Sequence, residues 1–331
     1  MINKTLYYIS EETNPYQNLA VEEALMDMVK EGECILYLWQ NRHTVVIGKN
    51  QNARMECKVD KLEEENGFLA RRLSGGGAVF HDLGNLNFTF IMRKEDYDLE
   101  RQVDVIAKAA QSFGIDVVKS GRNDILAEGR KFSGNAFYSN NVSSYHHGTI
   151  MLDVNPEMLP RYLNVSLDKL KSKGVDSVKS RVINLKELNS DISVEGMKEA
   201  LLWAFEQVYG SKPNPIIRSD FDARKVAVLT EKYASDEWKY GRVTECTCEL
   251  SRRFEWGGNT LKFGVEEGRV KDMAIESDAM DSEFIITLAE TLKGTEFTKA
   301  SMVEAILGTE AENELQETMK KDIAGLISES M

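Results

Sequence analysis

Three consecutive glycines constrain the fold of this chain more than any other feature of its sequence. Gly75, Gly76 and Gly77 lie between a strand-like run that ends near Leu73 and another that begins at Ala78. Glycine adopts positive φ at little steric cost, so successive N–H groups of such a turn can point into one concavity and bind an anion such as phosphate. A hairpin loop explains three glycines equally well. Taken alone, the segment predicts a tight connection between two strands and leaves its function open.

Charged residues favour the anion-binding interpretation of this turn. Arg71 and Arg72 precede the glycines, and a guanidinium can hold a phosphate through two parallel hydrogen bonds. The chain as a whole carries 41 Lys and Arg against 54 Asp and Glu, a net charge of −13, so it repels polyanions such as bulk nucleic acid. Neither the G-x-x-x-x-G-K-[ST] loop nor the G-x-G-x-x-G helix start occurs, which excludes the two familiar nucleotide motifs.

Length and composition predict a folded protein of two domains. The chain has 331 residues, of which 42% are hydrophobic, and this is ordinary globular usage. The sequence changes character near residue 245, so we expect domains over 1–245 and 246–331, with a hinge near 240–250. No apolar stretch approaches the roughly 18 residues that cross a bilayer. Four scattered cysteines are typical of a reducing compartment, and the protein is expected to be cytoplasmic.

Hydrophobic periodicity predicts that the first domain mixes helices and strands. A stripe of apolar residues indicates a helix over 18–30, with Glu22 and Glu23 off that stripe. Residues 216–241 show no regular pattern. Further helices are expected over 99–113, 156–163 and 194–209. Strand-like runs rich in β-branched and aromatic residues occupy 34–40, 44–48, 67–73, 78–80, 86–92, 115–118, 125–127, 132–138 and 148–154.

The C-terminal region reads as a small α+β domain. Short strands over 253–256, 260–265 and 269–275 are separated by turns at 257–259 and 267–268, which predicts a three-stranded meander. Helices are expected over 283–292, 299–307 and 310–327. Cys34 and Cys57 are expected in the core of the first domain. Cys246 and Cys248 are expected to be two packed thiols rather than a zinc site.

Five polar motifs lie between strand-like runs, where loops commonly carry function. They are RRLSGGGAVFHDLGN at 71–85, GRNDI at 121–125, RKFSGNA at 130–136, HHGTI at 146–150 and SVKSRVINL at 177–185. In this order they resemble the lipoate-protein ligase A family of the biotin and lipoate ligase superfamily. NLAVEEAL at 18–25, TVVIGKNQN at 44–52 and FEWGG at 254–258 extend the resemblance over almost the whole chain.

The resemblance implies both a fold and a reaction. The fold is α/β with mixed sheets: a large catalytic domain like that of biotin and lipoate ligases, distantly like class II aminoacyl-tRNA synthetases, and a small α+β domain. The reaction joins lipoate and ATP, with Mg²⁺, into lipoyl-AMP and pyrophosphate, and then passes the lipoyl group to a lysine. The implied acceptors are apo lipoyl domains of 2-oxoacid dehydrogenase complexes or the glycine-cleavage H protein. Neither nucleic acid nor membrane is an expected partner, and nothing demands more than a monomer.

The family pattern K-x-x-G-x-A assigns the site residues by resemblance. It matches Lys131, Gly134 and Ala136, and implies that the lysine contacts the lipoate carboxyl and the α-phosphate, where a fixed cation stabilises developing charge. The alternative is a solvated surface lysine. Asp124 is expected to orient Lys131 or hold Mg²⁺, or else to be a turn residue. The expected ligands of the phosphates and the acyl carboxylate are Arg72, Gly75, Gly76, Gly77, Ala78, Val79 and Phe80. Second-rank candidates are His81, for which a structural role fits equally well, and Asn85, Asn123, His147, Ser180 and Arg181.

Substrate chemistry adds two expectations. Lipoate is an apolar chain that ends in a dithiolane, so its pocket should be apolar, with charge only at the carboxyl. Lipoyl carriers are typically acidic, so an acidic enzyme needs a local basic patch to attract them. One candidate patch contains Lys169, Lys171, Lys173, Lys179 and Arg181, although a solvated face explains these charges more simply.

Three rival functions share parts of this pattern. A lipoyl or octanoyl transferase would use a preactivated or carrier-bound acyl group, and relatives that do so through a cysteine nucleophile need a thiol in the site. None of the four cysteines lies in the glycine-rich, Asp124 or Lys131 segments. A biotin ligase would carry a loop closer to G-R-G-R-x-G, which is absent. A non-catalytic adenylate sensor would need a DNA-binding module, and no basic segment precedes residue 18.

Overall fold

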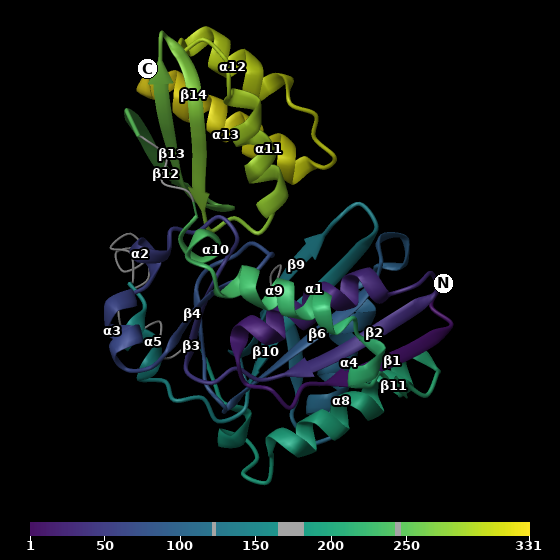
Figure 1. Cartoon of the computed structure of the whole chain (residues 1–331). Coiled ribbons are helices and arrows are strands. Elements are labelled where there is room, and N and C mark those ends of the chain that lie inside the picture. Colours follow the sequence, from purple (N-terminus) through teal and green to yellow (C-terminus); the bar gives the residue numbers. More distant parts are fainter. Residues whose placement is uncertain (121–123, 165–181, 242–245) are drawn as a thin grey trace. The chain divides into compact units, whose positions relative to one another are not determined.

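A computed structural model describes residues 1–120, 124–164, 182–241 and 246–331 (Figure 1). Its contacts group into two compact units. The first unit comprises Met1–Val46, Glu56–Arg71 and Val79–Lys239, and the second comprises Ile47–Met55, Arg72–Ala78 and Tyr240–Met331. Residues 72–78, called the glycine segment below, therefore cluster with the C-terminal residues. Residues 242–245 of the expected hinge lie outside the described residues.

An eight-stranded mixed sheet forms the centre of the first unit, in the order β11-β1-β2-β6-β10-β9-β8-β7. β1 pairs in parallel with β2 and β11, and the other neighbours are antiparallel. The strands are β1 Lys4–Ile9, β2 Glu33–Trp39, β6 Asn85–Arg93, β7 Val117–Ser120, β8 Asp124–Ala127, β9 Arg130–Ser139, β10 Ser143–Met151 and β11 Asn214–Pro215.

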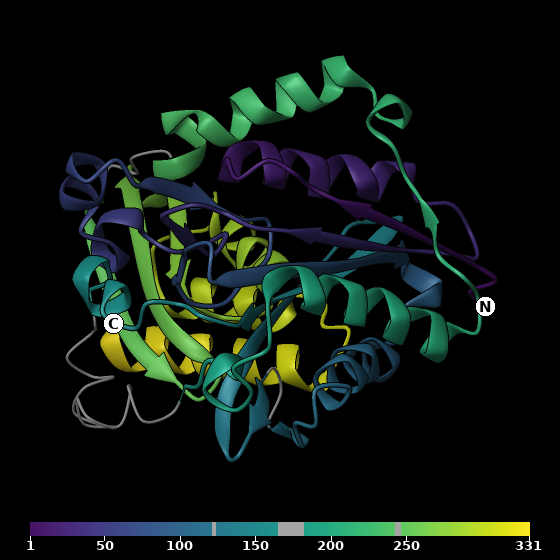
Figure 2. The same cartoon turned by 90° about the horizontal axis from the view of Figure 1, so that it is seen from below.

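Helices cover both faces of this sheet (Figure 2). On one face, α4 (Leu99–Gln111) and α8 (Val194–Tyr209) pack against each other, and the main core lies beneath them. On the other face lies α1 (Pro15–Met28), and α9 (Ala223–Ala234) packs on the outer side of α1. Residues on β6 alternate between these faces, so Phe88 belongs to the α4 side.

A second, three-stranded sheet in the order β4-β3-β5 carries the ends of the glycine segment. Its strands are β3 Thr44–Ile47, β4 Phe68–Arg71 and β5 Val79–His81. The remaining short elements are α2 Ala53–Glu56, α3 Val59–Glu64, α5 Met158–Tyr162, α10 Asp236–Tyr240 and the 3₁₀ turns Lys94–Asp96, Leu185–Glu187 and Arg218–Asp220. β4 ends directly before the glycine segment, and β5 begins directly after it.

The second unit contains an antiparallel meander with helices on one face (Figure 1). Alternate residues of the strands, such as Leu261 and Phe263, pack against Leu288 and Ile323 of the helices. The elements are β12 Cys248–Phe254, β13 Gly257–Glu266, β14 Arg269–Ser277, α11 Ser282–Leu292, α12 Lys299–Gly308 and α13 Glu314–Ser330. Three strands and three helices are present as expected, although the first strand covers 248–254 rather than 253–256. The first turn falls at Glu255–Trp256, and the expected turn at 257–259 is instead part of β13.

The structure corrects several local predictions. Residues 216–241 are not irregular, since they include α9 and α10. Tyr233 of α9 is buried, and Val226 and Leu229 on the same side of the helix are partly buried, so a short apolar stripe accompanies the ion pairs that α9 makes with α1. β1 was not among the predicted strands. Cys34 and Cys57 are buried as expected, but Cys246 is exposed, so the packed thiol pair was wrong. Within the described ranges, no helix is both long and apolar enough to cross a membrane.

Candidate active site

Lys131 and Asp124 form an ion pair on adjacent strands near one edge of the large sheet. Lys131 is the second residue of β9 and Asp124 the first of β8, and the lysine Nζ lies 2.6 Å from Asp124 Oδ1. Their side chains are 34% and 37% exposed, so water screens the attraction and the pair adds little to stability. Its consequence is geometric, because the carboxylate fixes where the ammonium points.

Gly134 explains the spacing of the K-x-x-G pattern. A Cβ at Gly134 would lie 2.9 Å from both Nζ and Cε of Lys131. The end of the lysine side chain therefore packs directly against Gly134, where any larger residue would clash with it. The Gly134 N–H donates to Thr149 Oγ1 at 3.3 Å. Across the next strand, a Cβ at Gly148 would lie 2.6 Å from the Gly134 carbonyl oxygen. Ala136 is buried and pairs with His147. Small residues thus leave room for the ammonium.

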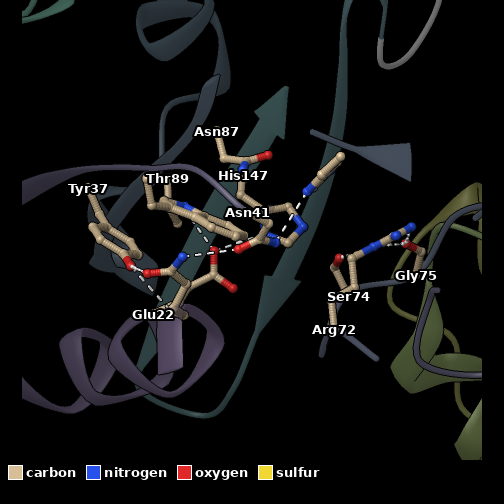
Figure 3. Close-up of polar contacts among 12 residues, drawn as sticks. Glu22, Tyr37, Asn41, Arg72, Ser74, Gly75, Asn87, Thr89 and His147 are labelled. Carbon is tan, nitrogen blue, oxygen red and sulfur yellow. Dashed lines mark hydrogen bonds and ion pairs between the residues drawn. The ribbon is translucent and has the colours of Figure 1, made fainter. Parts of the chain in front are cut away.

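A buried carboxylate lies on the α1 face of the same sheet (Figure 3). Glu22 of α1 is 2% exposed, and its Oε1 accepts hydrogen bonds from Thr89 Oγ1 at 2.7 Å and from His147 Nδ1 at 2.9 Å. Thr89 in turn accepts from Trp39 Nε1 at 3.0 Å. The sequence pattern placed Glu22 off the apolar stripe and gave it no role. The structure instead makes it the link between α1, β6 and β10.

The two neighbouring histidines of the HHGTI motif point to opposite faces of β10. His146 is fully buried on the α4 side, where Nδ1 lies 3.0 Å from Gln102 Oε1 and Nε2 lies 2.8 Å from Asn135 Oδ1. Burial lowers the pKa of His146 to about 3, and His147 adds to this effect. His146 is therefore neutral at physiological pH, and it braces the strand that carries Gly134.

A chain of amides orients His81, one of the second-rank candidates. Asn18 accepts from Tyr37 OH at 3.2 Å and donates to Asn41 Oδ1 at 3.0 Å. Because the oxygen of Asn41 is an acceptor, its Nδ2 faces His81 Nδ1, 3.3 Å away. This geometry makes His81 Nδ1 the acceptor of that hydrogen bond. Asn85 is also buried, and its Nδ2 donates to Asn87 Oδ1 at 2.9 Å.

Within the second unit, Arg72 organises the glycine segment. Its side chain is buried; Nε donates to Ser74 Oγ at 3.0 Å, and Nη2 donates to the carbonyl oxygens of Gly75 at 2.7 Å and Gly77 at 2.8 Å. Of the three consecutive glycines, only Gly76 has a positive φ, at 87°. Its N–H donates to the Ala279 carbonyl at 3.0 Å.

The other two glycines meet different surroundings. A Cβ at Gly75 would lie 2.3 Å from the Ala279 oxygen, whereas a Cβ at Gly77 would meet nothing within 4 Å. Close backbone packing therefore requires glycine at position 75 and not at position 77. Arg71 is engaged elsewhere, because its guanidinium donates to the carbonyls of Trp238 and Lys239. The structure gives Arg71 a bracing role in place of the expected arginine pair.

The remaining candidates are placed as follows. Val79 and Phe80 begin β5, and the Phe80 ring stacks on Tyr162 with centroids 5.6 Å apart. Ala78 precedes this strand and is partly exposed. Outside the described residues lie Asn123, Ser180, Arg181 and the expected basic patch at 169–181.

Comparison with known families agrees with this geometry. Residues 14–206 match the model of the lipoyl protein ligase A/B catalytic domain, and residues 244–327 match that of the bacterial lipoate protein ligase C-terminus. The chain belongs to the lipoyl protein ligase A/B family.

Individual relatives cover most of the chain. A lipoate-protein ligase A from Psychrobacter cryohalolentis is 40% identical over 295 residues, 87% of each protein. The crystal structure of P. falciparum LipL1 in complex with lipoate has a TM-score of 0.86 and 27% identity, and covers 98% of this chain and 99% of that one. A bipartite lipoate protein ligase from Thermoplasma acidophilum, solved in a study of that ligase and its E2 lipoyl domain, has a TM-score of 0.65 and 25% identity over 74% of this chain and 99% of that one.

Proposed function

We propose that this chain is an ATP-dependent lipoate–protein ligase. In the first step a carboxylate oxygen of lipoate bonds to the α-phosphorus of ATP, the bond from that phosphorus to the bridging oxygen breaks, and pyrophosphate leaves. In the second step an acceptor lysine amine bonds to the lipoyl carbonyl carbon and AMP leaves. The observation that carries the proposal is the Lys131 ammonium, held 2.6 Å from Asp124 and above Gly134, in a chain of this family.

Lys131 is proposed to act on both reacting groups of the first step. Its ammonium can bind the lipoate carboxylate and the α-phosphate oxygen, which reduces their mutual repulsion and stabilises the charge that develops between them. Asp124 holds the ammonium in place through its Oδ1. The absence of a side chain at Gly134 keeps the space above the strand open.

The glycine segment is proposed to bind the phosphates. Arg72 is the cation of this segment, and its guanidinium already keeps the carbonyls of residues 75 and 77 turned inward. The segment can then present N–H groups outward, as anion-binding loops do. Mg²⁺ would arrive as part of the ATP substrate, since it takes most of its ligands from phosphate and water and needs only one or two carboxylates. Asp124 can supply one.

The α1 face of the sheet is proposed to receive the acyl chain. From the Lys131 ammonium this face continues through Thr149 to the network of Thr89, His147 and Glu22. Thr89 and His147 both donate to Glu22 Oε1, so an apolar chain can lie against the rim of this network without leaving the carboxylate unpaired. In place of a purely apolar pocket, we therefore propose that the acyl chain makes apolar contacts above the hydrogen-bonded side chains of Glu22, Thr89 and His147.

The acceptor is proposed to be an apo lipoyl domain of a 2-oxoacid dehydrogenase complex or the glycine-cleavage H protein. An acyl transfer assay separates ligase from transferase, the alternative function. Apo lipoyl domain would be incubated with lipoate and MgATP in one reaction, and with a carrier-bound octanoyl group without ATP in another, and its mass followed by mass spectrometry. A ligase modifies the domain only in the first reaction. Modification only in the second would replace this proposal with the transferase.

A further inference from the structure

One buried amide on the α1 face has no acceptor for its N–H groups among the residues that the structure describes. Asn87 of β6 is 1% exposed. Its Oδ1 accepts from Asn85 Nδ2 at 2.9 Å, but no acceptor within the described residues binds its Nδ2. A buried donor without an acceptor destabilises a folded protein, and native structures pair most such groups. The Asn87 N–H groups are therefore available to an acceptor on a bound molecule.

The strand register places Asn87 in line with the catalytic lysine. Asn87 lies directly opposite Thr149 of β10, and opposed residues of antiparallel strands point to the same face. Thr149 Oγ1 accepts from the Gly134 N–H of β9, above which the Lys131 ammonium rests. Figure 3 shows Asn87 beside Thr89 and His147 on this face. The lysine and the amide thus mark two ends of one path across the sheet.

The length of this path matches the length of lipoate. Neighbouring strands lie about 4.8 Å apart, so two steps from β9 to β6 span about 10 Å. An extended chain advances about 1.2 Å per bond, as three bonds per residue do in an extended backbone. The sulfur-bearing carbons of lipoate lie five and seven bonds from its carboxyl carbon, which gives about 6–8 Å, and a carboxylate–ammonium contact adds about 3 Å.

We propose that Asn87 is a specificity-determining residue that donates a hydrogen bond to a dithiolane sulfur of lipoate. The inference rests on the proposed ligase function. Sulfur is a weak acceptor, and the same unit already contains such a contact, from Gln102 Nε2 to Met92 Sδ at 3.2 Å. Octanoate would place methylene groups against the same N–H and leave it unpaired, so the site rejects the saturated chain.

The test compares three acids that differ in shape and in sulfur. Lipoate, octanoate and 5-cyclopentylpentanoate, which has the same ring size without sulfur, would be assayed by acid-dependent pyrophosphate–ATP exchange. In the natural protein we expect kcat/KM for lipoate to exceed that for the cyclopentyl acid by about tenfold, since the sulfur acceptor is weak. Asn87→Leu, close in size and without a donor, should bring the ratio near one.

Two further variants keep the test decisive. Asn87→Ala removes the donor without adding bulk, in case leucine does not fit, and should also equalise lipoate and the cyclopentyl acid. Asn87→Ser keeps a donor and should retain part of the preference. An unchanged ratio in both the leucine and alanine variants overturns the role of Asn87. Lack of exchange with every acid in the natural protein would instead contradict the ligase function itself.

Discussion

Replacing Gly134 with alanine tests the geometry of the lysine most sharply. The added Cβ would lie 2.9 Å from Lys131 Cε and Nζ, and ordinary van der Waals contact begins at 3.4–4 Å. The ammonium must therefore move by about 0.5–1 Å, and a misplacement of about 1 Å can cost on the order of 100-fold in rate. The fold should tolerate the change, because the atoms that must move are the end of a flexible side chain and glycine within a strand is itself unfavourable.

The assay is lipoate-dependent exchange of labelled pyrophosphate into ATP, with thermal unfolding measured on the same samples. We expect kcat for exchange to fall about 100-fold in Gly134→Ala, while the Tm stays at or above that of the natural protein. Gly325→Ala is the matched control, because its Cβ meets nothing within 4 Å in the interior of α13, and it should leave exchange unchanged. Natural kcat and KM in Gly134→Ala would refute the placement of the Lys131 ammonium.

Four other predictions concern single residues. Lys131→Ala should abolish exchange and leave the circular dichroism spectrum unchanged; a folded variant with natural turnover would exclude Lys131. Glu22→Ala should lower the free energy of unfolding by about 1–3 kcal/mol, because it leaves buried donors of Thr89 and His147 unpaired; urea titration measures this, and no loss would contradict the burial. The folded pKa of His146 is lowered to about 3 from about 6.5 in unfolded chains, so stability should fall as pH drops from about 6.5 towards 3. This slope should flatten in His146→Gln. Hydrogen bonds from Arg161 and Tyr162 lower the pKa of Glu65 to about 2, so its contribution to the Tm should be present above pH 4–5 and lost as pH falls towards 2, with Glu65→Gln lacking this dependence.

Local pattern predicted most of the strands and the turn at the glycines, because each depends on neighbouring residues, but not β1 or β11. The lysine motif came from the resemblance to the family. Contacts between distant segments were beyond local pattern. Glu22 and His147 are 125 positions apart in the sequence. The periodicity of α1 cannot predict that the Glu22 carboxylate contacts a histidine on β10. α9 was missed although Val226, Leu229 and Tyr233 recur at helical spacing, because this stripe is short and charged residues surround it. One of those charged residues, Lys232, pairs with Glu23 of α1 at 2.8 Å. Asn87 has an unremarkable sequence context, and only the register reveals its unpaired amide.

Lipoate-dependent pyrophosphate–ATP exchange tests the proposed adenylation most directly, since only formation of an acyl-adenylate returns label to ATP. The natural protein and Lys131→Ala would be measured together with MgATP, with and without lipoate. The account predicts exchange that requires lipoate and is lost in Lys131→Ala. Absence of exchange in the natural, folded protein would contradict adenylation, and undiminished exchange in Lys131→Ala would contradict the assigned site.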